Sequence, residues 1–181
     1  MEIIAVVGMS GSGKTTTIEY LTSRLSKEGY KVGSIKHIHH QNFSIDTEGT
    51  DTWRHAHAGA IVTIAIAPKE IAIIKKTDGD LHNLDRIIKF LSEEGVDFVF
   101  IEGLHSLIAK KKDIFKIIVA KDPEELMMTL NGTVEPILAI TGVIAKRKFK
   151  ATNLNIPIID IEVEGDFLLK LVRDIAQKRL K

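Results

Sequence analysis

Short apolar runs alternate along the chain with longer stretches in which apolar residues recur every three or four positions. The runs are typical of buried strands, and the longer stretches are typical of amphipathic helices. Strands are expected at residues 3–7, 32–35, 61–66, 71–74, 96–101, 115–120, 137–140 and 156–159. Helices are expected at 15–27, 81–91, 123–130 and 167–180, with a short helical stretch at 51–58. This alternation predicts an α/β fold with a mainly parallel sheet.

Turn and cap residues place several element ends. Pro68-Lys69 separates two strand patterns and predicts a hairpin. Gly29 closes the first helix, and Asp122 is positioned to cap the helix that follows it. Residues 142–155 fit loop or partly helical structure. Because no repeat, low-complexity segment or linker interrupts the pattern, we expect a single domain over residues 1–181.

The first expected strand runs into Gly8-Met9-Ser10-Gly11-Ser12-Gly13-Lys14-Thr15, which an expected helix follows. This is the pattern of a phosphate-binding loop, whose backbone N–H groups and helix N-terminus attract phosphate oxygens. Lys14 would neutralise the β and γ phosphates, Thr15 would offer its hydroxyl to Mg²⁺, and Thr16 would contact an outer phosphate oxygen. The nucleotide-binding candidates of this motif are Gly8, Gly11, Ser12, Gly13, Lys14, Thr15 and Thr16. We therefore expect a P-loop NTPase-like three-layer α/β fold, with a mainly parallel sheet plus a hairpin.

Polar residues also follow the other expected strands. Lys36-His37 follows the second strand, Glu102 follows the strand at 96–101, and Thr141-Gly142 follows the strand at 137–140. Ligands of open α/β sheets bind at the carboxyl ends of the strands, so these residues are expected to face one crevice. Glu102 is the candidate to hold Mg²⁺ and support hydrolysis, and Lys36 and His37 are candidate nucleotide contacts.

A polar segment at 46–60 lies where such proteins carry the part of the chain that senses the γ phosphate. Asp46 or Asp51 can complete the Mg²⁺ shell or orient a water, and Arg54 can pair with a phosphate or with an acidic group of a partner. The catalytic candidates are therefore Glu102, Asp46 and Asp51. The metal-binding candidates are Thr15, Asp46 and Glu102.

Five of the seven histidines fall between residues 37 and 57. Their spacing fits a transition-metal site, provided that three or four ligands converge. The other interpretation makes His37 a phosphate or base contact and places His55 and His57 on a surface helix.

Composition narrows the classes of partner. A net charge of +1 argues against binding along a nucleic-acid backbone or an anionic membrane, where a basic excess supplies affinity. The lack of cysteine excludes disulfides, thiolate zinc sites and a cysteine nucleophile. No apolar run reaches the roughly 18 residues of a membrane span, and the N-terminus shows no basic leader. We therefore expect a cytoplasmic protein.

Together these motifs resemble the MobB family, the molybdopterin-guanine dinucleotide biosynthesis adaptor proteins. The resemblance rests on the phosphate loop, on Lys36-His37-Ile38-His39-His40, on Asp46 through Trp53-Arg54 to Ala60, and on Phe100-Ile101-Glu102-Gly103. The lysine-histidine cluster followed by the Asp, Gly, Asp, Trp-Arg segment is far more specific than the phosphate loop alone. In motif order the resemblance covers the N-terminal two thirds of the chain.

The resemblance implies GTP binding with Mg²⁺, weak GTP hydrolysis and a homodimer. It also implies action beside the molybdenum cofactor guanylyltransferase that joins GMP to molybdopterin, with molybdopterin as a further contact. By position, residues 11–16 would hold the phosphates, and Asp46, Asp51 and Glu102 would surround the metal and the attacking water. The sequence departs from related nucleotide-binding proteins at Thr141-Gly142, where many of them place an acidic residue that binds the guanine edge.

Two other functions remain open on sequence grounds. A metallochaperone GTPase that loads nickel or a similar ion would use the same fold and would explain the histidines, although the lack of cysteine and the Trp53-Arg54 pair count against it. A small-molecule kinase would need an acceptor pocket and a base near the γ phosphate, and a phosphate loop alone does not identify an acceptor. Binding of Ni²⁺ or Zn²⁺ would favour the chaperone, and retention by a guanylyltransferase would favour the adaptor.

Overall fold

The computed structural model describes residues 1–40, 43–77, 84–147 and 154–178. The chain divides into two compact units, one formed by Met1–His37 with Ile88–Lys181 and the other by Ile38–Ile87. Compact units of one chain can fold together or separately. The expectation of a single domain over residues 1–181 therefore stays a prediction.

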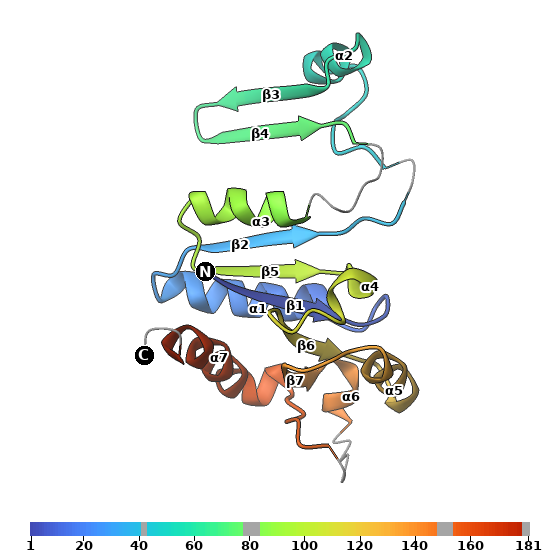
Figure 1. The fold of residues 1–181 in the computed structure, drawn as a ribbon, viewed down its shortest axis with the longest axis vertical. Coiled ribbons are helices and arrows are strands. Elements are labelled where there is room, and N and C mark those ends of the chain that lie inside the picture. The colour runs from blue at the N-terminus through green and yellow to red at the C-terminus, as the bar shows by residue number, and fades with distance from the viewer. Residues whose placement is uncertain (41–42, 78–83, 148–153, 179–181) are drawn as a thin grey trace. The chain divides into compact units, whose positions relative to one another are not determined.

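The first unit is built on a five-stranded parallel sheet in the order β2-β5-β1-β6-β7, whose arrows point the same way in Figure 1. Its strands are β1 (Glu2–Val7), β2 (Val32–Lys36), β5 (Phe98–Glu102), β6 (Phe115–Val119) and β7 (Ile137–Thr141). Lys36 pairs in register with Glu102, and Val6 of β1 pairs with Glu102 from the other side. The carboxyl ends of the three strands therefore bring the loop after β1, Lys36 and Glu102 to one edge of the sheet.

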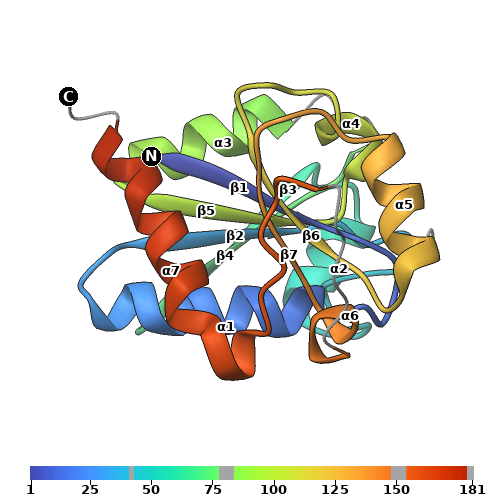
Figure 2. The same cartoon turned by 90° about the horizontal axis from the view of Figure 1, so that it is seen from below.

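Helices cover both faces of this sheet, as Figure 2 shows for α1 and α7 on one face and α5 on the other. The helices with residues in this unit are α1 (Lys14–Lys27), α3 (Leu84–Glu93), α4 (His105–Ile108), α5 (Pro123–Asn131), α6 (Val143–Lys146) and α7 (Ile161–Lys178). Leu21 and Leu25 of α1 pack with Leu168 and Val172 of α7 onto buried strand residues that include Phe100. Burial of this apolar surface is the main source of the unit's stability.

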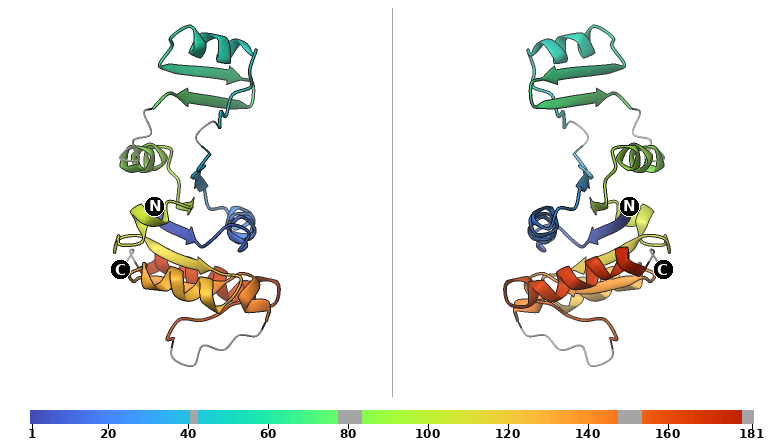
Figure 3. Two further views of the ribbon diagram at one scale, coloured as in Figure 1. Left: turned by 90° about the vertical axis from the view of Figure 1, so that its right-hand side faces the viewer. Right: turned by 90° about the vertical axis from the view of Figure 1, so that its left-hand side faces the viewer.

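The second unit contains α2 (Asp51–His57) and an antiparallel hairpin of β3 (Val62–Ala67) and β4 (Glu70–Lys75). Thr50 caps α2 by accepting a hydrogen bond from the Trp53 backbone N–H at 3.3 Å. The helix packs beside β3 (Figure 3). The hairpin expected around Pro68-Lys69 is therefore confirmed.

Most expected elements are present within a few residues of their expected ends, and the mainly parallel sheet plus hairpin is confirmed. The strand expected at 156–159 is wrong, because Ile158 makes only an isolated bridge to Ile140. The last helix begins at Ile161, earlier than expected. Residues 81–83 and 179–180 of two expected helices lie outside the described residues. None of the helices in the described part of the chain is long and apolar enough to cross a membrane.

Candidate nucleotide-binding site

The loop after β1 wraps tightly between the sheet edge and the start of α1. Gly8 lies where a Cβ atom would come within 1.9 Å of the Val119 carbonyl oxygen, so only glycine fits there. Gly13 precedes the helix with φ of 108°, a left-handed conformation that favours glycine. These two positions explain why the loop needs glycines and why α1 begins at Lys14 with its N-terminal N–H groups at the loop.

Lys14 folds back over this loop. Its ammonium donates to the Met9 carbonyl oxygen at 2.6 Å, and the Ser12 hydroxyl donates to the same oxygen at 2.9 Å. Partial burial lowers the pKa of Lys14, while the nearby Glu102 carboxylate acts in the opposite direction. The loop therefore holds a cation that donates to a neutral carbonyl group.

Glu102 at the end of β5 gathers two other predicted site residues. Its carboxylate accepts hydrogen bonds from the Thr15 hydroxyl at 3.2 and 3.1 Å and forms an ion pair with the Lys36 ammonium. The Glu102 side chain is only 9% exposed, so its charge is largely removed from water and depends on these partners. The sequence-based prediction that the strand ends converge therefore holds for Thr15, Lys36 and Glu102.

The same cluster has the chemistry of a magnesium site. Thr15 and Glu102 supply hydroxyl and carboxylate oxygens, the hard ligands that Mg²⁺ prefers. A cavity of about 330 Å³ opens beside them and is also lined by Ser34 and Lys36. The residues present at this end of the loop therefore fit a metal bound together with phosphates.

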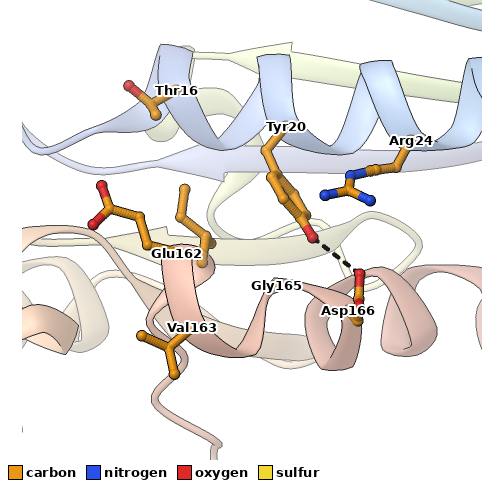
Figure 4. A pocket seen from close by; sticks show the side chains of 8 residues that line it. Thr16, Tyr20, Arg24, Glu162, Val163, Gly165 and Asp166 are labelled. Atoms are coloured by element: carbon orange, nitrogen blue, oxygen red, sulfur yellow. Dashed lines mark hydrogen bonds between the residues drawn. The ribbon is translucent and has the colours of Figure 1, made fainter.

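His37 and Thr16 flank the cluster on different sides. The His37 backbone N–H donates to the Glu102 carbonyl oxygen at 3.0 Å, which holds the chain after β2 against the end of β5. Thr16 lies on a separate pocket between α1 and α7 (Figure 4). Gly11 stands in open space, where a Cβ atom would meet nothing within 4 Å.

Asp46 and Asp51 belong to the second unit. Asp46 Oδ1 accepts hydrogen bonds from the Thr47 N–H and from the Thr50 and Thr52 hydroxyls. Desolvation raises the pKa of Asp46, but these hydrogen bonds outweigh it and lower the pKa overall. Asp51 lies 3.6 Å from Arg54 on the exposed first turn of α2. Their roles toward the metal and the attacking water stay predictions.

The histidines expected as candidate metal ligands lie on both units. Within residues 1–40, 43–77, 84–147 and 154–178, no group of three or more His, Asp or Glu side chains is placed to hold a metal ion. His57 stacks on Trp53 with ring centroids 4.3 Å apart. That contact gives His57 a packing role on α2.

Two features of the site were not predicted. Lys121 follows β6 and forms an ion pair with Glu125 at 2.7 Å, and both charges act electrostatically on Lys14. The sequence does contain a signal for Lys121, because it follows an expected strand in the same way as Lys36 and Glu102 do. Gly142 lies where a Cβ atom would be 2.6 Å from the Ser12 carbonyl oxygen, so it supports the loop by close packing.

Comparison with known proteins places this geometry in a family. The sequence matches the MobB family, described as molybdopterin guanine dinucleotide synthesis protein B, over residues 3–141. The molybdopterin-guanine dinucleotide biosynthesis adapter protein of Escherichia coli is 29% identical over 177 residues, which are 93% of this chain and 91% of that protein. A relative from Methanocaldococcus jannaschii is 35% identical over 124 residues, which are 68% of this chain. The match spans about half (49%) of the length of that relative.

The fold agrees with these matches. The crystal structure of Bacillus subtilis MobB superimposes with a TM-score of 0.73 at 29% identity, over 94% of this chain and 98% of that one. The expected P-loop NTPase-like fold is thereby confirmed. The family match covers the phosphate loop, both strand ends at Lys36 and Glu102, and the second unit, so this chain belongs to the MobB family of molybdopterin-guanine dinucleotide biosynthesis proteins.

Proposed function

We propose that this chain binds GTP with Mg²⁺ on its phosphate loop, hydrolyses it weakly, and acts in the cytoplasm as an adaptor of the guanylyltransferase that joins GMP to molybdopterin. The observation that carries the proposal is the cluster of Thr15, Lys36 and Glu102 beside the loop. The name of the Escherichia coli relative, an adapter protein of molybdopterin-guanine dinucleotide biosynthesis, supports the partnership.

Each residue of the loop has a defined task in this proposal. The backbone N–H groups of Gly11, Ser12 and Gly13, next to Gly8, would donate to phosphate oxygens at the start of α1. Lys14 would exchange the Met9 carbonyl for the β and γ phosphates, because anionic oxygens make stronger hydrogen bonds with an ammonium than a neutral carbonyl does.

The acidic side of the cluster would serve hydrolysis. Thr15 and Glu102 would hold Mg²⁺, which neutralises charge on the β and γ phosphate oxygens when it is bound. Glu102 would also orient the attacking water. Lys36 already lies in the cluster and would donate to phosphate oxygens together with His37. Thr16 would bind a phosphate oxygen at the opposite flank of the loop.

A calorimetric titration with GTP and Mg²⁺ tests this proposal. Lys14→Ala should weaken GTP binding at least about 100-fold, because it removes charge-assisted hydrogen bonds of about 1.5 to 3 kcal/mol each from two phosphates. Lys27→Ala is the matched control, since Lys27 is an exposed lysine at the far end of the same helix. If Lys14→Ala binds GTP as tightly as the unaltered protein, the loop is not the nucleotide site.

A further inference from the structure

The end of β7 cannot bind a base edge through its side chains. Thr141 is completely buried, and Gly142 has no side chain and packs against the loop, where a Cβ atom would also lie 2.8 Å from the Ala120 carbonyl oxygen. An acidic side chain at position 142 would collide with this backbone. A side chain that distinguishes guanine from adenine would therefore come from another part of the chain.

The two flanks of α1 indicate where a nucleoside would lie. Thr15 faces the cavity that contains Glu102 and Lys36, the expected position of the metal and the terminal phosphate. Thr16, the next residue, faces the pocket on the opposite side. A triphosphate that runs along the loop from the Glu102 side therefore directs its nucleoside toward Thr16.

The pocket at Thr16 is an open pocket between α1 and the start of α7. Its volume of about 360 Å³ is within the range of about 300 to 1,000 Å³ that is typical of ligand pockets. Tyr20 forms one wall, and Gly165 is required opposite it because a Cβ atom there would lie 2.4 Å from the tyrosine ring. The Tyr20 hydroxyl donates to Asp166 at 3.3 Å, which fixes this end of the pocket (Figure 4).

Glu162 presents the second carboxylate of the pocket at the end where Thr16 lies (Figure 4). Its Oε1 atom pairs with Lys146, and its backbone N–H donates to Asp160 Oδ1 at 3.0 Å. A non-helical residue, Glu164, separates this first turn from the rest of α7. Glu162 is thus an anchored carboxylate that is still 67% exposed, so a ligand can reach it.

A carboxylate accepts two parallel N–H bonds, and guanine offers such a pair at N1 and the 2-amino group. Adenine has an acceptor at N1 and only a C–H group at position 2, so it can make neither bond. We propose that Glu162, held by Lys146 in the pocket beside Thr16, binds the N1 and 2-amino edge of guanine and makes the site selective for GTP. This inference rests on the proposed binding of GTP at the phosphate loop.

Base exchange gives a direct test, because xanthine carries a carbonyl oxygen where guanine carries the 2-amino group. Glu162→Gln keeps the shape of the side chain and supplies an amide that can donate to this oxygen. We expect GTP affinity to fall at least tenfold, XTP affinity to rise at least tenfold, and ATP affinity to stay unchanged, measured by calorimetry with Mg²⁺. Glu164→Gln is the matched control, with the same charge change on an exposed residue that does not line the pocket.

The outcomes separate the two proposals. If the unaltered protein prefers GTP to ATP and Glu162→Gln keeps that preference without gaining XTP, the role of Glu162 is wrong while GTP binding stands. Equal affinity of the unaltered protein for GTP and ATP also overturns base selection. If the unaltered protein binds no nucleotide, or binds it independently of Lys14, the proposed function itself fails.

Lys146→Ala should reduce the preference for GTP without a gain in XTP binding, because it frees the Glu162 carboxylate without changing its chemistry.

Discussion

Glu102 combines two tasks that a carboxylate at a strand end can perform. In the structure it joins Thr15 to Lys36, and in the proposed function the same oxygens would hold Mg²⁺. Its backbone position is fixed, because β5 lies between β1 and β2 and is paired with both strands at Glu102. Its low exposure restricts the side chain further. A fixed carboxylate next to a helix N-terminus orients a ligand without a further ordering cost.

Glu102→Gln should separate hydrolysis from binding. The amide still accepts from Thr15 but no longer carries the charge that attracts Mg²⁺, so GTP turnover should fall about tenfold or more while GTP affinity changes little. Phosphate release at saturating Mg²⁺ measures this. Glu94→Gln, which makes the same change on an exposed residue outside the cavity beside Glu102, is the control. Equal turnover in Glu102→Gln and the unaltered protein would show that Glu102 has no part in hydrolysis.

His105 offers a test of stability against pH. Its Nε2 lies 2.8 Å from the Thr133 hydroxyl, which itself donates to the Thr129 carbonyl oxygen and must therefore accept from His105. Burial lowers the pKa of His105 below its usual value of 6.5. The unfolded chain then binds this proton at a higher pH than the folded chain, so the free energy of unfolding should fall as pH decreases below about 6.5.

Urea denaturation at pH 7.5 and pH 5.5 measures the His105 effect against His105→Gln. Glutamine can still donate to Thr133 but does not titrate, so the variant should lose less stability between the two pH values. The comparison isolates His105 from the carboxylates and other histidines that titrate in the same range. An identical loss in both proteins would contradict a lowered pKa.

The sequence predicted those site residues that belong to a recognisable motif or directly follow an expected strand. Lys14 and Thr15 come from the loop pattern, and Lys36 and Glu102 from the rule that ligands bind at strand ends. Glu162 could not be predicted in this way. It lies between the strand expected at 156–159 and the helix expected at 167–180, and its pocket forms only when α7 packs against α1.

Element prediction succeeded where apolar periodicity was long or capping chemistry was specific. Asp122 accepts from the Glu125 backbone N–H at 2.9 Å and starts α5, as the sequence indicated. The four-residue helix α4 was not predicted, because a single turn contains too few positions to show a period. The four-residue helix α6 lies in residues 142–155, for which loop or partly helical structure was expected. Residues 156–159 are apolar like a strand, but they meet β7 only at Ile140, where Pro157 and Ile159 make backbone hydrogen bonds and Ile158 forms an isolated bridge.

At the scale of the whole molecule, the two units differ in how they bury apolar surface. The first unit encloses its core between the sheet and helices such as α1 and α7. In the second unit, Thr63 is buried on one face of the hairpin, while the opposite face carries four exposed isoleucines. They form two cross-strand pairs, Ile64 with Ile73 and Ile66 with Ile71. A contiguous exposed apolar face of this kind is typical of an interaction surface, and we propose that it joins two copies of the chain.

Ile66→Glu tests that homodimer. Ile66 is 81% exposed within one chain, so the substitution should leave the folded unit intact. A twofold interface uses the same patch on both copies, so the substitution introduces two charges into it. Burial of these charges should cost about 3 kcal/mol or more, which weakens dimerisation at least about 100-fold.

The molar mass measured by light scattering during gel filtration should then change from twice 20.1 kDa to 20.1 kDa. Ile45→Glu, at an equally exposed isoleucine outside the hairpin, should keep the dimer mass. A dimer that survives Ile66→Glu would assign the interface to another surface, and a monomeric unaltered protein would exclude the homodimer.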